Sequence, residues 1–470
     1  MGGCSSKSEA THRTSGVAYT VSEGSVVLQE ALLLCLHSAH NLPSLDFGSE
    51  SDVYCIANLI TKGAKNPIAS ARWPVKWDAT DPMWNSCRLI GSEVVPAPDD
   101  RLDLLFFDHD DTSSDDLIGT AKCSVGQLTD GGLVGAELTL PIKLTKRAKR
   151  ASRKGVALPC CVISRRLASD SPSRKVVYVV RHGESVWNKA QKDKDAVAML
   201  STVDHPLNEA GKEQAEGLRT ALCEGVDRCA DDALELMKAQ AVWSSPLTRA
   251  LETCLIALQP LIVQRSGPGC NGTRGGGGGG AATGGAAEAA GGEAAAAAAV
   301  EPLTVALNPN LREKRNFGGK DSSGKWCGDA LSEGVHSELD KLFADDEATA
   351  KALSAVPLDL SQVQNRWWLG SKESEQHVGE RIEELVSQVR FSPHSSIVLV
   401  GHSHYFREVL RRCRSPAGCT LTDAAGITID PADADAKKLS NAGIARLDFD
   451  FTSEKPITSV RLLFNTQLVK

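Results

Sequence analysis

The 470-residue chain lacks any apolar run of about 20 residues and any secretory signal, so we expect no membrane-spanning helix. It also lacks an excess of positive charge. The formal net charge is −7 and the pI is near 5.9, which argues against a dedicated nucleic-acid binder. The 14 cysteines show no paired short spacings, so we expect reduced thiols in the cytosol. A chain of this length is expected to form two to three domains.

One segment lacks the apolar residues that a folded core needs. Residues 266–300 contain a glycine run at 275–280 and an alanine run at 294–299. Such a composition predicts a disordered insertion. Because long surface insertions cost little free energy, the residues on either side of it can still lie close together in space.

A buried parallel strand is predicted at Val176–Val180, and it opens onto an Arg-His-Gly-Glu segment at 181–184. Ligands of open α/β sheets bind at the carboxyl ends of such strands. His182, flanked by Arg181 and Gly183, is therefore well placed to attack a phosphoryl group. The alternative is a surface loop that contains these residues by chance, because short motifs carry false positives.

Three further segments repeat this pattern. The apolar segment Ala241–Trp243 precedes a helix that starts near Pro246 and carries Arg249, and Ile397–Val400 ends just before His402. Residues 310–318 place Glu313 among basic side chains. Two histidines, two arginines and one acid are the groups that phosphoryl transfer needs: a nucleophile, cations for the phosphoryl oxygens and a proton donor. Taken alone, Arg249 could be a helix-surface arginine and His402 a core histidine.

The motifs resemble those of the histidine phosphatase superfamily, also called phosphoglycerate-mutase-like. The matching segments occur in the family's order and cover about residues 173–470: 181–185 with Trp187 and Asn188, 204–207 with Gly211, 244–246 with Arg249, 311–318, and 401–402. The resemblance implies a three-layer α/β domain with a mostly parallel sheet.

The same resemblance implies the role of each residue. His182 would become the phosphohistidine, Arg181, Arg249 and His402 would hold the phosphoryl group, and Glu313 would act as proton donor. Asn188 matches a further phosphate-contacting position. The two arginines are expected to lower the pKa of His182 and keep its imidazole neutral at pH 7. No metal or cofactor is expected for this reaction, since the cations neutralise the phosphoryl oxygens.

The N-terminal third has a different pattern. Residues 24–140 alternate apolar and polar positions between turn signals, which predicts an all-β sandwich. Strand-like runs at Val26–Leu36 and Leu102–Phe107 lead to acid-rich loops at 46–52 and 108–116. Carboxylate clusters of this kind select Ca²⁺, although Asp, Ser and Gly are also default turn residues.

The spacing of these acids resembles that of a C2 domain, and more narrowly of the copine subgroup, over residues 21–167. The resemblance implies five calcium ligands: Asp46, Asp52, Asp108, Asp110 and Asp116. Val53 departs from the family, which usually has proline there. The basic stretch 143–154 is expected to be a loop before the last strand that contacts anionic phospholipid. A nuclear-localisation signal and a merely solvated loop are the alternatives.

The first six residues, Met-Gly-Gly-Cys-Ser-Ser, fit the pattern for myristoylation at Gly2, with Cys4 available for palmitoylation. Two acyl chains would anchor the chain stably, whereas one is marginal. Residues 1–20 are otherwise expected to be disordered. An unmodified tail is the alternative.

Together these features predict a membrane-recruited phosphoric monoester hydrolase on the cytosolic face of a membrane, partly free in the cytosol. Its substrate would be a phosphorylated small molecule or a phosphoprotein. A phosphoglycerate-mutase-type phosphotransferase is one alternative, disfavoured because no proline-rich segment follows Glu313. A catalytically idle membrane adaptor is the other, disfavoured because His182 and both arginines are present.

Overall fold

The structure is a computed structural model that describes residues 11–14, 17–22, 25–46, 50–91, 94–110, 114–128, 135–152, 155–263, 302–315, 320–369, 373–415 and 418–470. Gly2, Cys4 and the Gly/Ala-rich segment 266–300 lie outside the described residues.

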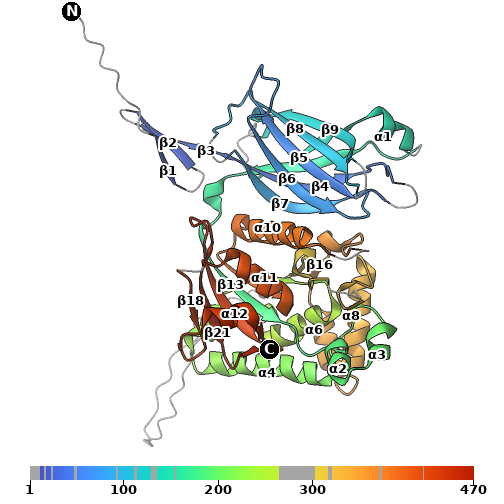
Figure 1. The fold of residues 1–470 in the computed structure, drawn as a ribbon, viewed down its shortest axis with the longest axis vertical. Coiled ribbons are helices and arrows are strands. Elements are labelled where there is room, and N and C mark those ends of the chain that lie inside the picture. The colour runs from blue at the N-terminus through green and yellow to red at the C-terminus, as the bar shows by residue number, and fades with distance from the viewer. Residues whose placement is uncertain are drawn as a thin grey trace, which may run out of the picture.

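The N-terminal region is a β-sandwich, as predicted (Figure 1). One sheet has the order β10 (Leu138–Pro141), β12 (Cys160–Arg166), β4 (Leu32–His40) and β7 (Met83–Ile90). The other has the order β11 (Lys143–Leu144), β9 (Asp116–Ser124), β8 (Arg101–Asp108), β5 (Val53–Ile60) and β6 (Ala69–Lys76). Alternate side chains of both sheets meet in one core that includes Trp73, Trp84 and Phe106.

Four details of this region differ from the sequence-based expectations. Part of the expected disordered tail forms strands β1 (Thr11–Thr14) and β2 (Val17–Ser22), which pair with β3 (Ser25–Glu30) in a separate antiparallel sheet. The β-branched and aromatic residues within 17–21 favour strand formation. The expected strand over Val26–Leu36 is thus divided between β3 and β4.

The expected basic loop contains a helix, α1 (Lys146–Ala151). Thr145 caps it, because its side chain accepts a hydrogen bond from the Ala148 amide at 3.2 Å, and Lys, Arg and Ala are good helix formers. The expectation of reduced thiols is also wrong at one pair. Cys35 and Cys87 lie directly opposite each other on β4 and β7 and form a disulfide.

The C-terminal region is built on an eight-stranded, mostly parallel sheet. Its strand order is β16 (Leu358–Asp359), β15 (Val305–Leu307), β14 (Ala241–Ser244), β17 (Ser396–Gly401), β13 (Arg174–Arg181), β20 (Ile444–Asp450), β21 (Ile457–Leu463) and β18 (Thr420–Thr422). A two-stranded sheet of β19 (Lys438–Leu439) and β22 (Leu468–Val469) lies outside it. This is the phosphoglycerate-mutase-like α/β fold that the motifs predict.

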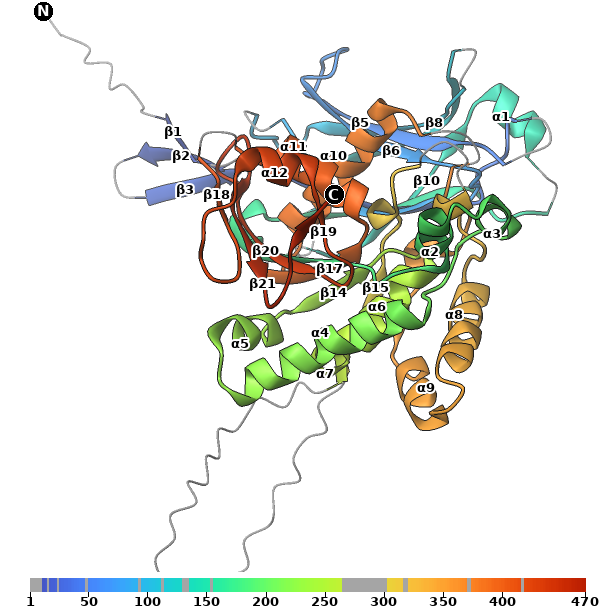
Figure 2. The same ribbon diagram turned by 60° about the horizontal axis from the view of Figure 1, so that its bottom comes forward.

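Helices cover both faces of this sheet, as Figure 2 shows. Tyr178 and Val180 of β13 point into a core shared with α4 (Glu209–Asp227), α6 (Thr248–Ala257) and α7 (Gln259–Val263). Val177 and Val179 point into the opposite core, shared with α10 (Glu375–Phe391) and α11 (Ser403–Cys413). Because successive side chains of a strand point to opposite faces, the apolar run of β13 serves both layers.

The remaining helices are α2 (Val186–Asp193), α3 (Ala196–Ser201), α5 (Asp231–Met237), α8 (Asp329–Leu342), α9 (Glu347–Ser354) and α12 (Pro431–Ala436). Short 3₁₀ turns lie at Pro309–Leu311, Lys320–Ser322 and Ser361–Val363. Within the parts of the chain that the structure describes, no helix is both long and apolar enough to cross a membrane.

Helix α10 joins the two regions. One side of it packs on the α/β sheet, and the other lies against the sandwich sheet that ends in β7 (Figure 1). Phe391 at its C-terminus packs with Leu33, Cys35 and Cys87 of the sandwich. Arg88 of β7 forms an ion pair with the fully buried Glu384 of α10. The sandwich therefore contacts an element that also supports the α/β sheet.

Candidate active site

The two histidines singled out from the sequence follow neighbouring parallel strands. β13 and β17 pair with Arg181 opposite Gly401, so His182 and His402 leave the sheet at the same edge. The His182 amide donates to the Gly401 carbonyl at 3.0 Å, which ties the two strand ends together. The ring centroids of the histidines lie 5.0 Å apart.

The His182 ring is held in one tautomer. Its Nδ1–H donates to the Gly183 carbonyl oxygen at 2.6 Å, which leaves Nε2 with a free lone pair. The Gly183 amide in turn donates to the Thr253 hydroxyl at 3.0 Å, and that hydroxyl donates to the Arg249 carbonyl at 2.7 Å. Helix α6 therefore fixes the loop that carries His182.

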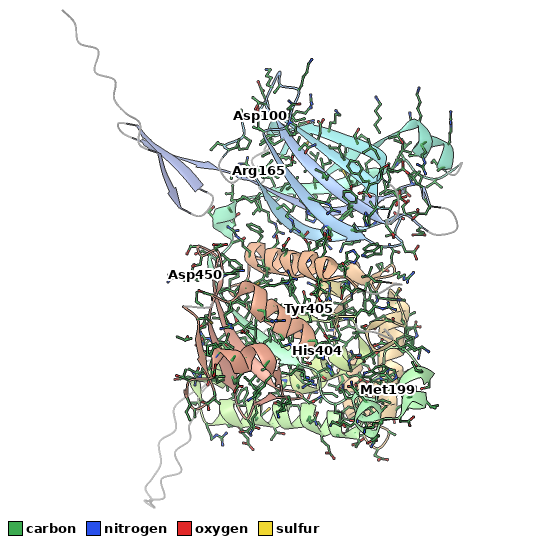
Figure 3. All side chains as sticks on the ribbon, in the orientation of Figure 1. Asp100, Arg165, Met199, His404, Tyr405 and Asp450 are labelled. Atoms are coloured by element: carbon green, nitrogen blue, oxygen red, sulfur yellow. A yellow bond between two sulfur atoms is a disulfide. The ribbon has the colours of Figure 1, made fainter. Side chains whose placement is uncertain are left out.

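His402 stands at the N-terminus of α11 and is fully buried. Its Nε2 lies 2.9 Å from the Ser245 hydroxyl, and its Nδ1 has no hydrogen-bond partner. Tyr405 and His404, on the first turn of the same helix, are labelled in Figure 3 within the C-terminal region.

The two arginines present unsatisfied donors. Arg249 is almost fully buried, and its Nε and one terminal nitrogen have no partner, while the other donates to the Asp321 carbonyl oxygen at 2.9 Å. Arg181 donates to the Leu439 carbonyl at 2.5 Å, and its Nε has no partner. Buried donors without acceptors cost free energy, so these nitrogens are suited to bind an anion.

Glu313 is buried beside these cations. Its Oε1 accepts hydrogen bonds from the amides of Lys314 at 2.8 Å and Tyr405 at 3.1 Å. Burial is the main cause that raises the pKa of its carboxyl group. A raised pKa keeps more of the acid protonated, which suits a proton donor.

The pKa of each histidine is shifted below its usual value, which favours the neutral imidazole. Burial lowers the pKa of His182 well below its usual value, and Arg249 and Arg181 lower it further. Burial, Arg249 and His182 do the same for the pKa of His402. The expectation named the arginines as the cause, whereas burial is the larger one.

Asn188 lies on α2, half-buried, close to the same loop. Its side-chain oxygen accepts from the Ser185 amide at 3.2 Å, and its own amide donates to the Ser185 hydroxyl at 3.2 Å, which forms a capping box. The structure thus gives Asn188 a helix-capping contact in addition to its expected place near the phosphate.

Two acids near Arg249 had no role in the sequence-based prediction. Asp321 lies 3.2 Å from Arg249 as an ion pair. Asp204 accepts from the Thr248 amide and hydroxyl, both at 2.9 Å, and so fixes the N-terminus of α6. Asp204 belongs to the quoted 204–207 motif, but only the fold shows what it contacts. Nothing in the sequence marked Asp321.

The acid-rich loops of the sandwich also come together. Burial, followed by the charges of Asp108 and Asp110, raises the pKa of Asp46. The pKa of Asp52 rises to about 6, again mainly through burial, with Asp46 and Asp108 adding to it. Such mutual repulsion means that the four carboxylates share one small region, and oxygen donors of this kind fit Ca²⁺.

These loops do not have the arrangement of a bound metal site. Within the described ranges, no three His, Cys, Asp or Glu side chains are placed to hold a metal ion, and residues 47–49 and 111–113 of the loops fall outside those ranges. Asp108 accepts from the Ser51 hydroxyl at 2.7 Å and from the Asp52 amide at 2.8 Å. Asp116 forms an ion pair with Arg147 of α1. Each Asp108 oxygen keeps a second lone pair beside its hydrogen bond, whereas the carboxylate of Asp116 is engaged by the Arg147 cation.

The geometry brings two histidines, two arginines and a buried acid together in an α/β domain, which is joined to a β-sandwich with acidic loops. Comparison with known families agrees. Residues 177–265 match the model of the histidine phosphatase superfamily, branch 1, and residues 30–140 match the model of the C2 domain. One segment of the chain thus matches a C2 domain, and another matches a histidine phosphatase domain.

Comparison with solved structures matches both regions of the chain. The first C2 domain of plant extended synaptotagmin 1 is 14% identical and covers 29% of this chain and 93% of its own, with a TM-score of 0.22. A candidate α-ribazole-5′-P phosphatase from Escherichia coli is 16% identical and covers 62% of this chain and 95% of its own, with a TM-score of 0.31. A mycobacterial glucosyl-3-phosphoglycerate phosphatase is 15% identical, covering 61% and 96%, with a TM-score of 0.29. No curated protein sequence matches the chain at a significant level.

Proposed function

We propose that the chain is a phosphatase that transfers a phosphoryl group to His182 and then to water. The observation that carries this proposal is the environment of the His182 ring. Its Nδ1–H is engaged by the Gly183 carbonyl, while buried nitrogens of Arg181, Arg249 and His402 have no acceptor. The catalytic domain is taken as residues 173–470 and the C2 domain as residues 21–167.

In the first step, Nε2 of His182 attacks phosphorus, and the bond from phosphorus to the leaving-group oxygen breaks. Arg181 and Arg249 donate hydrogen bonds to the phosphoryl oxygens, as does His402 through a nitrogen that carries a proton. Glu313 gives its proton to the leaving oxygen, which departs as an alcohol. In the second step Glu313 accepts a proton from water, and the water oxygen displaces His182 from phosphorus to release inorganic phosphate.

The test is to trap the intermediate. The full chain is mixed with a ³²P-labelled aryl phosphate and quenched within milliseconds, and the labelled residue is identified by mass spectrometry. We expect an acid-labile, base-stable label on His182 and neither label nor turnover in His182→Ala. His404→Ala is the matched control, because His404 lies in the first turn of α11, just after β17, and has no assigned role. Label on another residue, or substantial turnover by His182→Ala, overturns the proposal.

We further propose that the C2 domain recruits this phosphatase to anionic membrane and that calcium strengthens the recruitment. The crowded carboxylates of Asp46, Asp52, Asp108 and Asp110 support this, since a cation would relieve their repulsion. In this proposal Arg147 must release Asp116 before that carboxylate can serve as the fifth ligand. The helix to which Arg147 belongs carries the basic side chains that contact phospholipid.

Liposome co-sedimentation of the full chain tests this recruitment. Calcium should increase binding to anionic liposomes, and Asp108→Asn with Asp110→Asn should remove that increment while a salt-sensitive basic component remains. Equal binding with calcium and with chelator would refute the metal role.

Acylation at Gly2 and Cys4 is a separate proposal. Gly2→Ala should shift the chain from membrane to cytosol at resting calcium, and an unchanged distribution would contradict it.

A further inference from the structure

A cavity of about 80 Å³ lies between the two domains, away from His182. The sandwich lines it with the end of β6 and the following turn, including Lys76 and Trp77. The phosphatase domain lines it with the 3₁₀ turn before Arg312 and with the start of α10, including His377. The volume has room for several water molecules or for one small oxyanion.

The charged side chains around this cavity are mostly cationic. Arg312, Arg366 and Arg381 line it together with Lys76, and Glu380 is the one carboxylate in its described lining. Glu380 lies 3.7 Å from Arg72, and Arg366 lies 3.0 Å from Asp78, so those charges are already balanced.

The other cations lack a full set of counter-charges. Arg312 and Arg381 share a single carboxylate, that of Glu373. Lys76 has no ion-pair partner among the described residues, and it is half-buried. Burial, followed by the charges of Arg312 and Arg88, lowers the pKa of Lys76 to about 8. The cavity therefore carries an excess of about two positive charges.

Two buried donors or acceptors on the cavity wall are also unsatisfied. Nδ1 of His377 and Nε of Arg366 have no hydrogen-bond partner among the described residues. The His377 ring is held in place against the Trp77 ring, with centroids 5.4 Å apart. Buried polar atoms are normally satisfied, so these two unpartnered nitrogens make the cavity suited to a ligand that offers acceptor oxygens.

We propose that this interdomain cavity binds a small free oxyanion of the phosphate type. Lys76 from the C2 domain and His377 and Arg366 from the phosphatase domain would contact it together. The bound anion would neutralise the excess charge and strengthen the docking of one domain on the other. Inorganic phosphate, which the proposed reaction releases, is one such anion.

The cavity also adjoins the proposed proton donor. Arg381 donates to the Arg312 carbonyl at 2.7 Å, and the guanidinium of Arg381 lies 4.3 Å from the ring centre of Tyr405. The Tyr405 amide is a donor to Glu313. Tyr405 therefore connects Arg381, which lines the cavity, with the carboxyl group of Glu313.

Hydrogen exchange of the full chain, resolved by peptide and titrated with inorganic phosphate at constant ionic strength, tests the proposal. We expect saturable slowing in peptides that span 73–80 and 375–382. Lys76→Met should weaken this response about ten- to a hundredfold, because one charge-assisted contact is lost. Lys65→Met is the matched control, since Lys65 is exposed on the same domain, and it should respond like the unaltered chain.

His377→Phe is the second variant; it keeps a ring against Trp77 and removes Nδ1, and it should also weaken the response. Peptides that span 181–188 report phosphate binding at the proposed active site. The experiment therefore distinguishes a loss of binding at the cavity from a loss of binding at the active site. The proposal is overturned if phosphate causes no saturable slowing at the interdomain peptides, or if Lys76→Met responds like Lys65→Met. Slowing by vesicles that contain phosphatidic acid, with none by free phosphate, would assign the cavity to a lipid head group and equally overturn it.

Discussion

Glu313 shows how burial of a single side chain sets a kinetic property. Its raised pKa keeps the carboxyl group protonated to higher pH than a free glutamate, so turnover of substrates with poor leaving groups should fall as pH rises through that pKa. Glu313→Gln should slow such substrates by roughly 10²–10⁴ and remove the alkaline limb. Activated aryl phosphates need little protonation and should be slowed far less. Steady-state rates of both substrates from pH 4 to 9 provide the measurement, and equal slowing of both would remove Glu313 as the acid.

The carboxylate of Glu373 pairs with two buried guanidinium groups, those of Arg312 and Arg381. Burial alone would raise its pKa, but Arg381 and Arg312 lower it from 4.5 to about 2. Because the folded pKa lies below the unfolded value, the carboxylate stabilises the fold above about pH 4.5, and this contribution is lost as pH falls toward 2.

We therefore expect Glu373→Gln to lower the free energy of unfolding by about 3–5 kcal/mol at pH 7, since two buried guanidinium groups lose their carboxylate. The difference from the unaltered chain should shrink between pH 4.5 and 2. Urea unfolding at pH 7, 4 and 3 measures both effects. If the difference in unfolding free energy between Glu373→Gln and the unaltered chain stays constant over this range, Glu373 is not the charged carboxylate that we describe.

At the scale of elements, the His182 loop and helix α4 meet backbone to backbone. A Cβ on Gly211 would lie 2.1 Å from the Glu184 carbonyl oxygen, and one on Gly183 would lie 2.5 Å from the Gly211 carbonyl oxygen. Gly211→Ala should therefore displace the loop, cost about 1–3 kcal/mol of stability and strongly reduce turnover.

Gly217→Ala is the matched control on the same helix, where a Cβ would meet nothing within 4 Å. It should keep full activity and raise stability by up to about 1 kcal/mol, because alanine has the higher helix propensity. Thermal unfolding and turnover of both variants make the comparison. Similar behaviour of the two alanines would mean that the close approach does not position the loop.

The strands that precede the proposed catalytic histidines could be predicted because their side chains are buried on both faces. The apolar runs before His182 and His402 both indicate a buried strand. Strands β13 and β17 match the predicted runs within two residues at either end. Helix α1 could not be predicted in this way, because its Lys and Arg residues suit a helix and a loop equally. Its formation depends on the Thr145 cap and on Ala148, which packs into the sandwich core. The cap is a local signal that Thr145 offers, but the packing of Ala148 depends on strands far away in the sequence.

At the scale of the whole molecule, the docking of the two domains was not predictable from the sequence. The pairing of Arg88 with Glu384 joins residues 296 positions apart, and neither stands in a recognisable motif. Asp321 escaped notice for the same reason, since its proximity to Arg249 exists only in the folded chain. The roles of His182, Arg249, His402 and Glu313 remain predictions, but the fold brings their side chains close enough to shift one another's pKa values.

The buried ion pair between the domains gives the last prediction. Glu384 is fully buried and Arg88 is 18% exposed, and burial lowers the pKa of Arg88 to about 10. Arg88→Leu leaves the Glu384 carboxylate buried without a counter-charge, which should cost about 3–5 kcal/mol and allow the domains to unfold in two transitions. Arg88→Leu combined with Glu384→Leu should recover much of that loss, because no unpaired charge remains. Arg101→Leu is the control, since the Arg101 side chain is 47% exposed and its partner Asp103, within the sandwich, also pairs with Lys122; it should cost less than about 1 kcal/mol. Calorimetry of the four proteins decides the matter, and a single unchanged transition in Arg88→Leu would show that this pair does not hold the domains together.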